Sequence, residues 1–147
     1  MIKTFVHDVC DILRVEMPSI SFDTSNFLSS TMMAQVDLKK SILYIRKSKR
    51  VTPDYFFAIA HELRHIWQYQ NDEQYYLSNY RTSNKCKSVE EYNLQIAEVD
   101  ANAFAAIIMI EEFHLCPQWK GLSDKVVSAI EKRIKIVIHE LDKGKRP

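Results

Sequence analysis

Two histidines four residues apart frame the segment of this sequence best suited to chemistry, His61-Glu62-Leu63-Arg64-His65. An α-helix turns about 100° per residue, so His61 and His65 lie one turn apart on one face and both imidazoles reach a single metal ion. Glu62 lies beside them, where its carboxylate holds a water on that ion instead of acting as a ligand. Zn²⁺ lowers the pKa of such a water toward about 7, and Glu62 takes the proton. The spacing therefore predicts a zinc-dependent hydrolytic site.

The residues around this segment predict the helix that the site needs. Thr52-Pro53-Asp54 combines an N-cap hydroxyl, a proline at the first helical position and an acid in the first turn, so we expect a helix from there to about Gln70. The apolar residues gather on the side of the helix opposite His61, so we expect the histidines to face away from the apolar core behind the helix. These apolar residues are Phe56, Ile59, Ala60, Leu63, Ile66 and Trp67.

A catalytic zinc takes three protein ligands and keeps one position open, so a third donor is expected elsewhere in the chain. Glu98 is the preferred candidate, because Ala101 and Ala105 on the same helical face are small enough to let two helices approach one ion. Asp100, His114 and a water remain alternatives for this position.

At these residues the chain resembles the glutamate-zincin metallopeptidases, especially the ImmA/IrrE type and the stand-alone minimal gluzincins. The residues that carry the resemblance are 61–68 (HELRHIWQ) and 98–105 (EVDANAFA), and it covers roughly residues 34–113. It implies that His61, His65 and Glu98 are the metal ligands and that Glu62 is the general base. It also implies a hairpin before the motif, one edge strand of which holds an extended peptide substrate.

Two residues depart from that family's usual pattern. Asn102 stands where many relatives carry an aspartate that accepts a hydrogen bond from a ligand histidine; an amide still accepts from an imidazole N–H, with less polarisation. Arg64 replaces the usual small residue within the motif. We expect Arg64 to be solvated or ion-paired, with a clamp for a substrate carboxylate as the alternative.

The periodicity predicts an α+β fold over residues 1–147 that is mainly helical with a short hairpin before the histidine helix, and the resemblance implies that it is a small zincin-like domain. An amphipathic helix is expected from Ile2 until Pro18 ends it, and Ser88 with Glu91 forms a capping box that opens a helix reaching Phe113. The remaining expected elements are a hairpin of 34–38 and 42–46 and a last helix from Gly121-Leu122-Ser123 to Gly144. The polar, tyrosine-rich segment 71–87 gives no clear pattern.

The second hairpin strand, Ile42–Arg46, is predicted to be the substrate-binding edge. Alternation places Tyr44 and Arg46 on the face that borders the groove, so both are candidate substrate contacts. Residues 39–50 carry six basic side chains and no acid. We expect this run to protect a solvated edge, with docking of an anionic partner as the alternative.

Composition limits the partners. Twenty basic and nineteen acidic residues give a net charge of +1, so no general nucleic-acid-binding field is expected. The longest apolar stretch, Ala103–Ile110, is far below the ~20 residues that span a bilayer. The N-terminal segment does not resemble a signal peptide, and three widely spaced cysteines suit reduced thiols, so a cytoplasmic location is expected.

These observations predict a zinc metallopeptidase that hydrolyses the peptide bonds of a peptide or protein substrate through a zinc-bound water activated by Glu62. The alternative is a non-catalytic module, of phage or plasmid type, in which zinc only stabilises a binding or regulatory fold. A tyrosine could stabilise the oxyanion during hydrolysis. The candidates are Tyr69, Tyr75, Tyr76 and Tyr80, among which the sequence does not choose.

Overall fold

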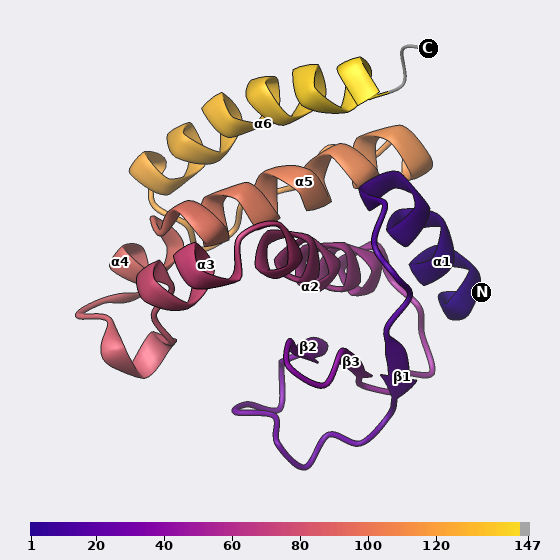
Figure 1. Ribbon diagram of the computed structural model, residues 1–147. Helices are drawn as coiled ribbons and strands as arrows, with labels where there is room; N and C mark the ends of the chain where they lie inside the picture. The colour runs from indigo at the N-terminus through magenta and orange to yellow at the C-terminus, as the bar shows by residue number, and fades with distance from the viewer. Residues whose placement is uncertain (145–147) are drawn as a thin grey trace. The chain divides into compact units, whose positions relative to one another are not determined.

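The protein has an α+β fold, mainly helical with one three-stranded sheet, as predicted. The structure is a computed structural model that describes residues 1–144 (Figure 1). By their internal contacts the residues form two compact units, Met1–Glu73 and a second that begins at Gln74. The expectation of one domain over residues 1–147 stays a prediction. None of the helices in the described part of the chain is both long and apolar enough to cross a membrane.

The first unit packs two helices with the sheet. Its elements are α1 (Ile2–Leu13), β1 (Ser19–Ser21), β2 (Ala34–Asp37), β3 (Ile42–Ile45) and α2 (Pro53–Asn71). Helix α1 ends before the predicted Pro18, because Arg14 adopts a left-handed conformation (φ 57°), its N–H donates to the Asp11 carbonyl and the N–H of Val15 donates to the Cys10 carbonyl. The side chains of Val6, Val9 and Leu13 on α1 are buried.

The hairpin of β2 and β3 forms as predicted, but β3 is not an edge strand. The strand order is β1-β3-β2: Ser19 pairs with Ile42 in the parallel direction, and Ala34 pairs with Ile45 in the antiparallel direction. The prediction that Ile42–Arg46 forms the open edge is therefore wrong, because the short strand β1 occupies the side of β3 that the hairpin leaves open. The edges of this sheet are β1 and β2.

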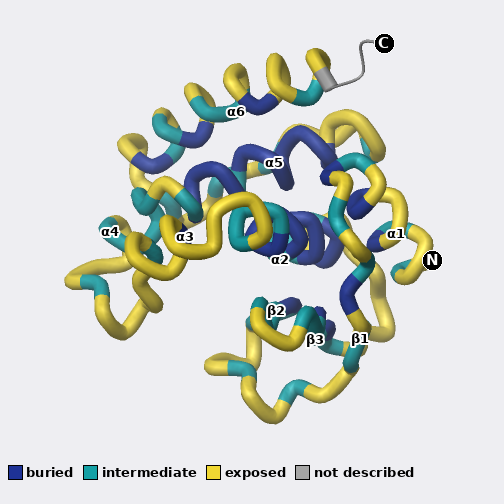
Figure 2. The backbone as a smooth tube through the Cα atoms, in the orientation of Figure 1, coloured by how far each residue is buried: buried dark blue, intermediate teal, exposed yellow. Residues whose placement is uncertain are grey.

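Helix α2 is the element that carries the histidines, and it begins and ends within a residue or two of the predicted bounds. It contacts α1, β2 and β3. Figure 2 shows the buried stretch of α2 in dark blue, and the side chains expected to oppose the histidines are buried except Trp67, which is half-buried; Tyr55 is buried as well. Each fully buried large side chain of this kind contributes about 1.5–3 kcal/mol, so packing fixes how α2 is rotated about its axis.

The second unit consists of helices. They are α3 (Glu73–Asn79), η1 (Ser83–Lys85), α4 (Val89–Asn93), α5 (Ile96–Phe113) and α6 (Asp124–Gly144), with α3 beginning at the boundary between the units. The side chain of Ser88 accepts from the Glu91 N–H at 3.0 Å, which confirms Ser88 as the N-cap of the predicted capping box, while the Glu91 carboxylate accepts from the Lys87 N–H at 2.8 Å. The predicted continuous helix to Phe113 is wrong, however, because Gln95 adopts ψ 141° and separates α4 from α5.

The helix break at Gln95 coincides with two hydrogen bonds from the Gln95 side chain to an earlier loop. Its side-chain amide accepts from the backbone N–H of Arg81 at 2.7 Å and donates to the backbone carbonyl of Arg81 at 2.9 Å. Both bonds join residues 14 positions apart in the sequence. The Gln95 side chain therefore satisfies the backbone N–H and carbonyl of Arg81. Helix α5 begins one residue after Gln95.

Helix α6 packs along α5. Val99 and Ala103 of α5 form a buried cluster with Val126 and Ile130 of α6, and Trp119 packs against it. Figure 2 shows α5 dark blue over most of its length. The buried carboxylate of Asp100 accepts from the guanidinium Nε of Arg133 at 2.8 Å, which adds an ion pair to this apolar contact.

Burial makes Cys10 the least reactive of the three cysteines, none of which is in a disulfide. Burial and the nearby charge of Asp11 raise the pKa of the Cys10 thiol to about 11, so at pH 8 only about 0.1% is thiolate. We expect a thiol-exchange dye at pH 8 to label the exposed Cys116 and the half-buried Cys86 before Cys10, which labels fully only in guanidinium. A Cys10→Ser variant should leave the early labelling unchanged. Equal early labelling of all three thiols in the native protein would contradict this expectation.

Candidate metal centre

Helix α2 brings the two histidines of the motif together. The Nε2 atoms of His61 and His65 are 3.1 Å apart, and the ring centroids are 4.8 Å apart with an interplanar angle of 80°. His65 is only 4% exposed, whereas His61 is half-buried. The four-residue spacing therefore places two imidazole nitrogens at one point on α2, as the sequence predicts.

The spacing of these nitrogens fits a shared zinc ion. Two nitrogen ligands at about 2.0–2.1 Å from a tetrahedral ion are about 3.3 Å apart, close to the separation of the His61 and His65 Nε2 atoms. The same separation also fits a hydrogen bond between one protonated and one bare nitrogen. In both cases a lone pair of one ring faces the other ring. A pair of neutral imidazoles is also a donor set that zinc prefers.

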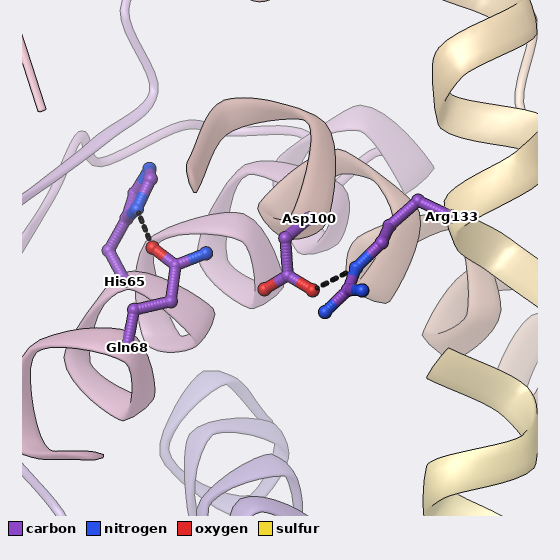
Figure 3. Close-up of polar contacts among 4 residues, drawn as sticks. All are labelled: His65, Gln68, Asp100 and Arg133. Atoms are coloured by element: carbon purple, nitrogen blue, oxygen red, sulfur yellow. Dashed lines mark hydrogen bonds and ion pairs between the residues drawn. The ribbon is translucent and has the colours of Figure 1, made fainter. Parts of the chain in front are cut away.

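A hydrogen bond on its far side orients the ring of His65. The Nδ1 atom of His65 lies 2.8 Å from the side-chain Oε1 of Gln68, which comes three residues later on the same helix (Figure 3). The sequence analysis did not assign Gln68 any role. The spacing alone could have found it, because residues three apart on a helix are neighbours.

Glu62 lies next to His61 on α2 and is half-buried. Its position is about 100° round the helix from His61 and about 60° beyond His65 on that side. The carboxylate therefore flanks the two rings instead of standing between them. This position suits a general base that accepts a proton from a water held by the two histidine ligands' metal ion.

The other residues expected at the site belong to the second unit. Glu98 is in the first turn of α5 and is 3% exposed, and Asn102 follows it four residues later and is half-buried. Their spacing puts them on one face of α5. Asp100 lies about 200° round the helix from Glu98, and its carboxylate is held by Arg133 of α6 (Figure 3).

These contacts separate the alternatives for a third ligand. Asp100 already neutralises Arg133, so using it as a metal ligand would take a carboxylate from a buried ion pair. His114 lies past the end of α5, where it is exposed and caps the helix in a left-handed conformation (φ 54°). Sixteen residues separate it from Glu98, or about 24 Å along a helix. Glu98 thus combines burial with a direction away from Arg133.

The expected substrate contacts Tyr44 and Arg46 depended on an open β3 edge, which the sheet does not have. Tyr44 is half-buried and pairs with Gln35 on one side and Ser21 on the other. The guanidinium of Arg46 donates to the backbone carbonyls of Met32 at 2.8 Å and Ser29 at 3.1 Å. Arg46 therefore fixes the loop between β1 and β2, and it also lies over the ring of Phe27.

Arg64 was expected to be solvated or ion-paired, and its burial contradicts only the solvated form. It is 2% exposed, and its guanidinium carbon lies 3.7 Å from the centroid of the Trp67 ring, three residues later on α2. A guanidinium stacked on indole is stabilised by cation–π attraction, which is stronger away from water. Arg64 thus covers Trp67 and is a packing element of the helix.

The four candidate tyrosines lie in different environments. Tyr69 continues the stripe of His61 and His65 along α2, and its hydroxyl donates to the Glu73 carboxylate at 2.8 Å. That hydrogen bond, together with burial and the charges of Glu73 and Asp37, raises the pKa of Tyr69. In the second unit Tyr76 stacks on Tyr80 with centroids 5.0 Å apart, and Tyr75 is exposed. Among these tyrosines, Tyr69 alone shares the histidine stripe of α2.

Comparison with protein-family models, curated proteins and solved structures finds no match to this chain.

The role of Asp100 can be tested through its partner. Arg133→Met removes the cation that faces a buried carboxylate, so we expect the free energy of unfolding to fall by about 1–3 kcal/mol, less than for a fully buried pair because Arg133 is partly exposed. Urea unfolding followed by circular dichroism measures the change. Lys132→Met, at an exposed neighbour, should change stability by no more than about 0.5 kcal/mol. Equal stabilities of the two variants would show that the ion pair contributes nothing.

Proposed function

We propose that this protein is a zinc-dependent peptidase with a zincin-like fold. The observation that carries the proposal is the 3.1 Å separation of the His61 and His65 Nε2 atoms on a helix whose motif also supplies Glu62. Two nitrogens at this distance suit one shared ion, and a carboxylate beside them suits proton transfer. The resemblance of segments 61–68 and 98–105 to the glutamate zincins supports the same reaction.

We propose Glu98 as the third ligand. Its support comes from α5 itself: Glu98 is buried, it shares a face with Asn102, and Asp100 on another face is committed to Arg133. A carboxylate oxygen is also a ligand that zinc accepts together with histidine nitrogens. Asn102 is proposed to accept a hydrogen bond from a ligand histidine, in the role that aspartate has in many members of the family.

In the proposed reaction, zinc when bound supplies a Lewis acid that acidifies a water and polarises the scissile carbonyl. Glu62 accepts the proton of that water as it attacks the carbonyl carbon. Glu62 then gives the proton to the nitrogen of the leaving amine, so the carboxylate is regenerated and one peptide bond is hydrolysed. His61 and His65 hold the ion and transfer no proton in this scheme.

The substrate would lie along β2, the edge strand of the hairpin. The backbone N–H of Arg46 donates to the Met33 carbonyl, so alternation turns the backbone groups of Ala34 and Val36 away from β3. Asp37 at the end of β2 is close enough to raise the pKa of Tyr69 on the histidine stripe of α2. Strand β2 also contacts α2, so an extended peptide paired with β2 would lie beside the helix that carries the histidines.

The other edge is less suited to a peptide. The Ser19 N–H donates to the Ser41 carbonyl, so in the three-residue strand β1 only Ile20 turns its backbone groups outward. Pro18, just before β1, has no N–H to donate. We also propose a cytoplasmic location, which suits three cysteines that are all free.

The ligand set can be tested by metal content. Protein purified without chelator should carry about one zinc per chain, and His61→Ala and Glu98→Ala should each weaken zinc binding by 100-fold or more, because each removes a direct ligand. Competition with a chromophoric chelator measures the affinity. Glu111→Ala, at an exposed position of the same helix as Glu98, is the matched control and should bind zinc like the wild type. Undiminished zinc binding by Glu98→Ala would exclude it as the third ligand.

The role of Glu62 separates a peptidase from a zinc-stabilised binding module. Glu62→Gln keeps the size of the side chain but removes the base, so zinc content and circular dichroism should stay unchanged while hydrolysis of a peptide library falls by about 10²–10⁴-fold. Glu112→Gln, at an exposed position, should retain full activity. If zinc-loaded wild type and Glu62→Gln are equally inactive, the non-catalytic alternative replaces the peptidase.

A further inference from the structure

We infer that Gln68 is a positioning residue that prepares His65 to bind the metal. Its side-chain carbonyl holds the imidazole in the tautomer with hydrogen on Nδ1, which leaves the Nε2 lone pair facing His61. The inference rests on the metal centre of the proposed function, and it adds a residue that neither the sequence pattern nor the family resemblance assigns to the site.

In the hydrogen bond between His65 and Gln68, the histidine is the donor. The Oε1 atom of Gln68 is an amide oxygen, which only accepts, so the Nδ1 atom of His65 at 2.8 Å must be the donor. A neutral imidazole carries one hydrogen on its two nitrogens. With that hydrogen on Nδ1, Nε2 is left with a lone pair and can act as a ligand.

The lone pair of the His65 Nε2 atom points toward His61. The Nε2 atom of His65 faces the Nε2 atom of His61 at 3.1 Å, on the side of the ring away from Gln68. The ring of His65 is 4% exposed, so water has little access to compete for Nδ1. Gln68 thus orients the His65 imidazole through Nδ1, and the Nε2 atom of the same ring faces the Nε2 atom of His61.

The spacing of Gln68 and His65 on α2 allows the amide to orient the imidazole before any metal is bound. Residues three apart on an α-helix are neighbours, so Gln68 reaches His65 without any contribution from the rest of the chain. The contact therefore forms with the helix, before any metal is bound. Hydrogen bonds from metal-binding histidines to outer groups fix the tautomer and commonly alter metal affinity by about 10–100-fold.

The experiment compares four forms of the full chain: wild type, Gln68→Leu, Gln68→Glu and Gln70→Leu. Leucine removes the acceptor, glutamate restores an acceptor oxygen at the same reach, and Gln70 is an exposed glutamine on the same helix. We expect Gln68→Leu to lose 10–100-fold in zinc affinity by chelator competition. Gln68→Glu should stay within threefold of the wild type or bind more tightly, and Gln70→Leu should match the wild type.

A second measurement uses no metal. In zinc-free protein, nitrogen-15 NMR of the histidine rings distinguishes hydrogen on Nδ1 from hydrogen on Nε2, and His65→Ala assigns the signals. The wild type and Gln70→Leu should show His65 with hydrogen on Nδ1, and Gln68→Leu should lose this preference. A purely structural role for Gln68 would leave the tautomer unchanged, because circular dichroism and stability report packing but not the position of this hydrogen.

The outcomes separate the two hypotheses. Unchanged zinc affinity and an unchanged His65 tautomer in Gln68→Leu would overturn the inference while leaving the zinc site in place. A loss of affinity that Gln68→Glu does not restore would also overturn it, because the acceptor oxygen would then not be the cause. A wild type that binds no zinc would overturn the proposed function first, and this is visible before any Gln68 variant is measured.

Discussion

Two imidazole nitrogens held 3.1 Å apart require something positive between them, either a shared hydrogen or a metal ion. That requirement is the constraint on which the rest of the candidate centre depends. Gln68 occupies the Nδ1 side of His65, so the lone pair of its Nε2 is left for the shared point. The Nε2 atom of His61 lies at that point, where it either donates a hydrogen to the lone pair or binds an ion together with it.

The constraint is maintained by packing on the opposite side of α2. The helix contacts α1, β2 and β3, and its side chains Ile59 and Leu63 are fully buried. A rotation of α2 that moved the histidines would expose these side chains at a cost of about 1.5–3 kcal/mol each. Tyr55 adds a polar link, since its hydroxyl donates to the backbone carbonyl of Arg46 just after β3. The apolar face thus fixes the direction of the polar one.

The sequence predicted what depends on neighbours within one or two turns. The start of α2, the adjacency of His61 and His65, and the cap at Ser88 all follow from spacings of four residues or fewer. The break at Gln95 escaped prediction because its cause is the backbone of Arg81, which no periodicity reveals. The burial of Arg64 escaped because arginine is usually exposed, although its stacking partner Trp67 lies three residues away.

The position of β3 shows how one short non-local pairing changes a functional argument. Three residues, Ser19–Ser21, are too few to carry a clear alternating pattern, yet their parallel pairing with β3 turns an expected edge into a centre. The basic residues of segment 39–50 therefore do not flank an open edge of β3. Arg46 instead donates to the loop that joins β1 to β2, the connection that this order of strands requires. Arg46 of the basic run therefore stabilises the β1–β2 connection, and β2, which contacts α2, is left as the longer of the two open edges.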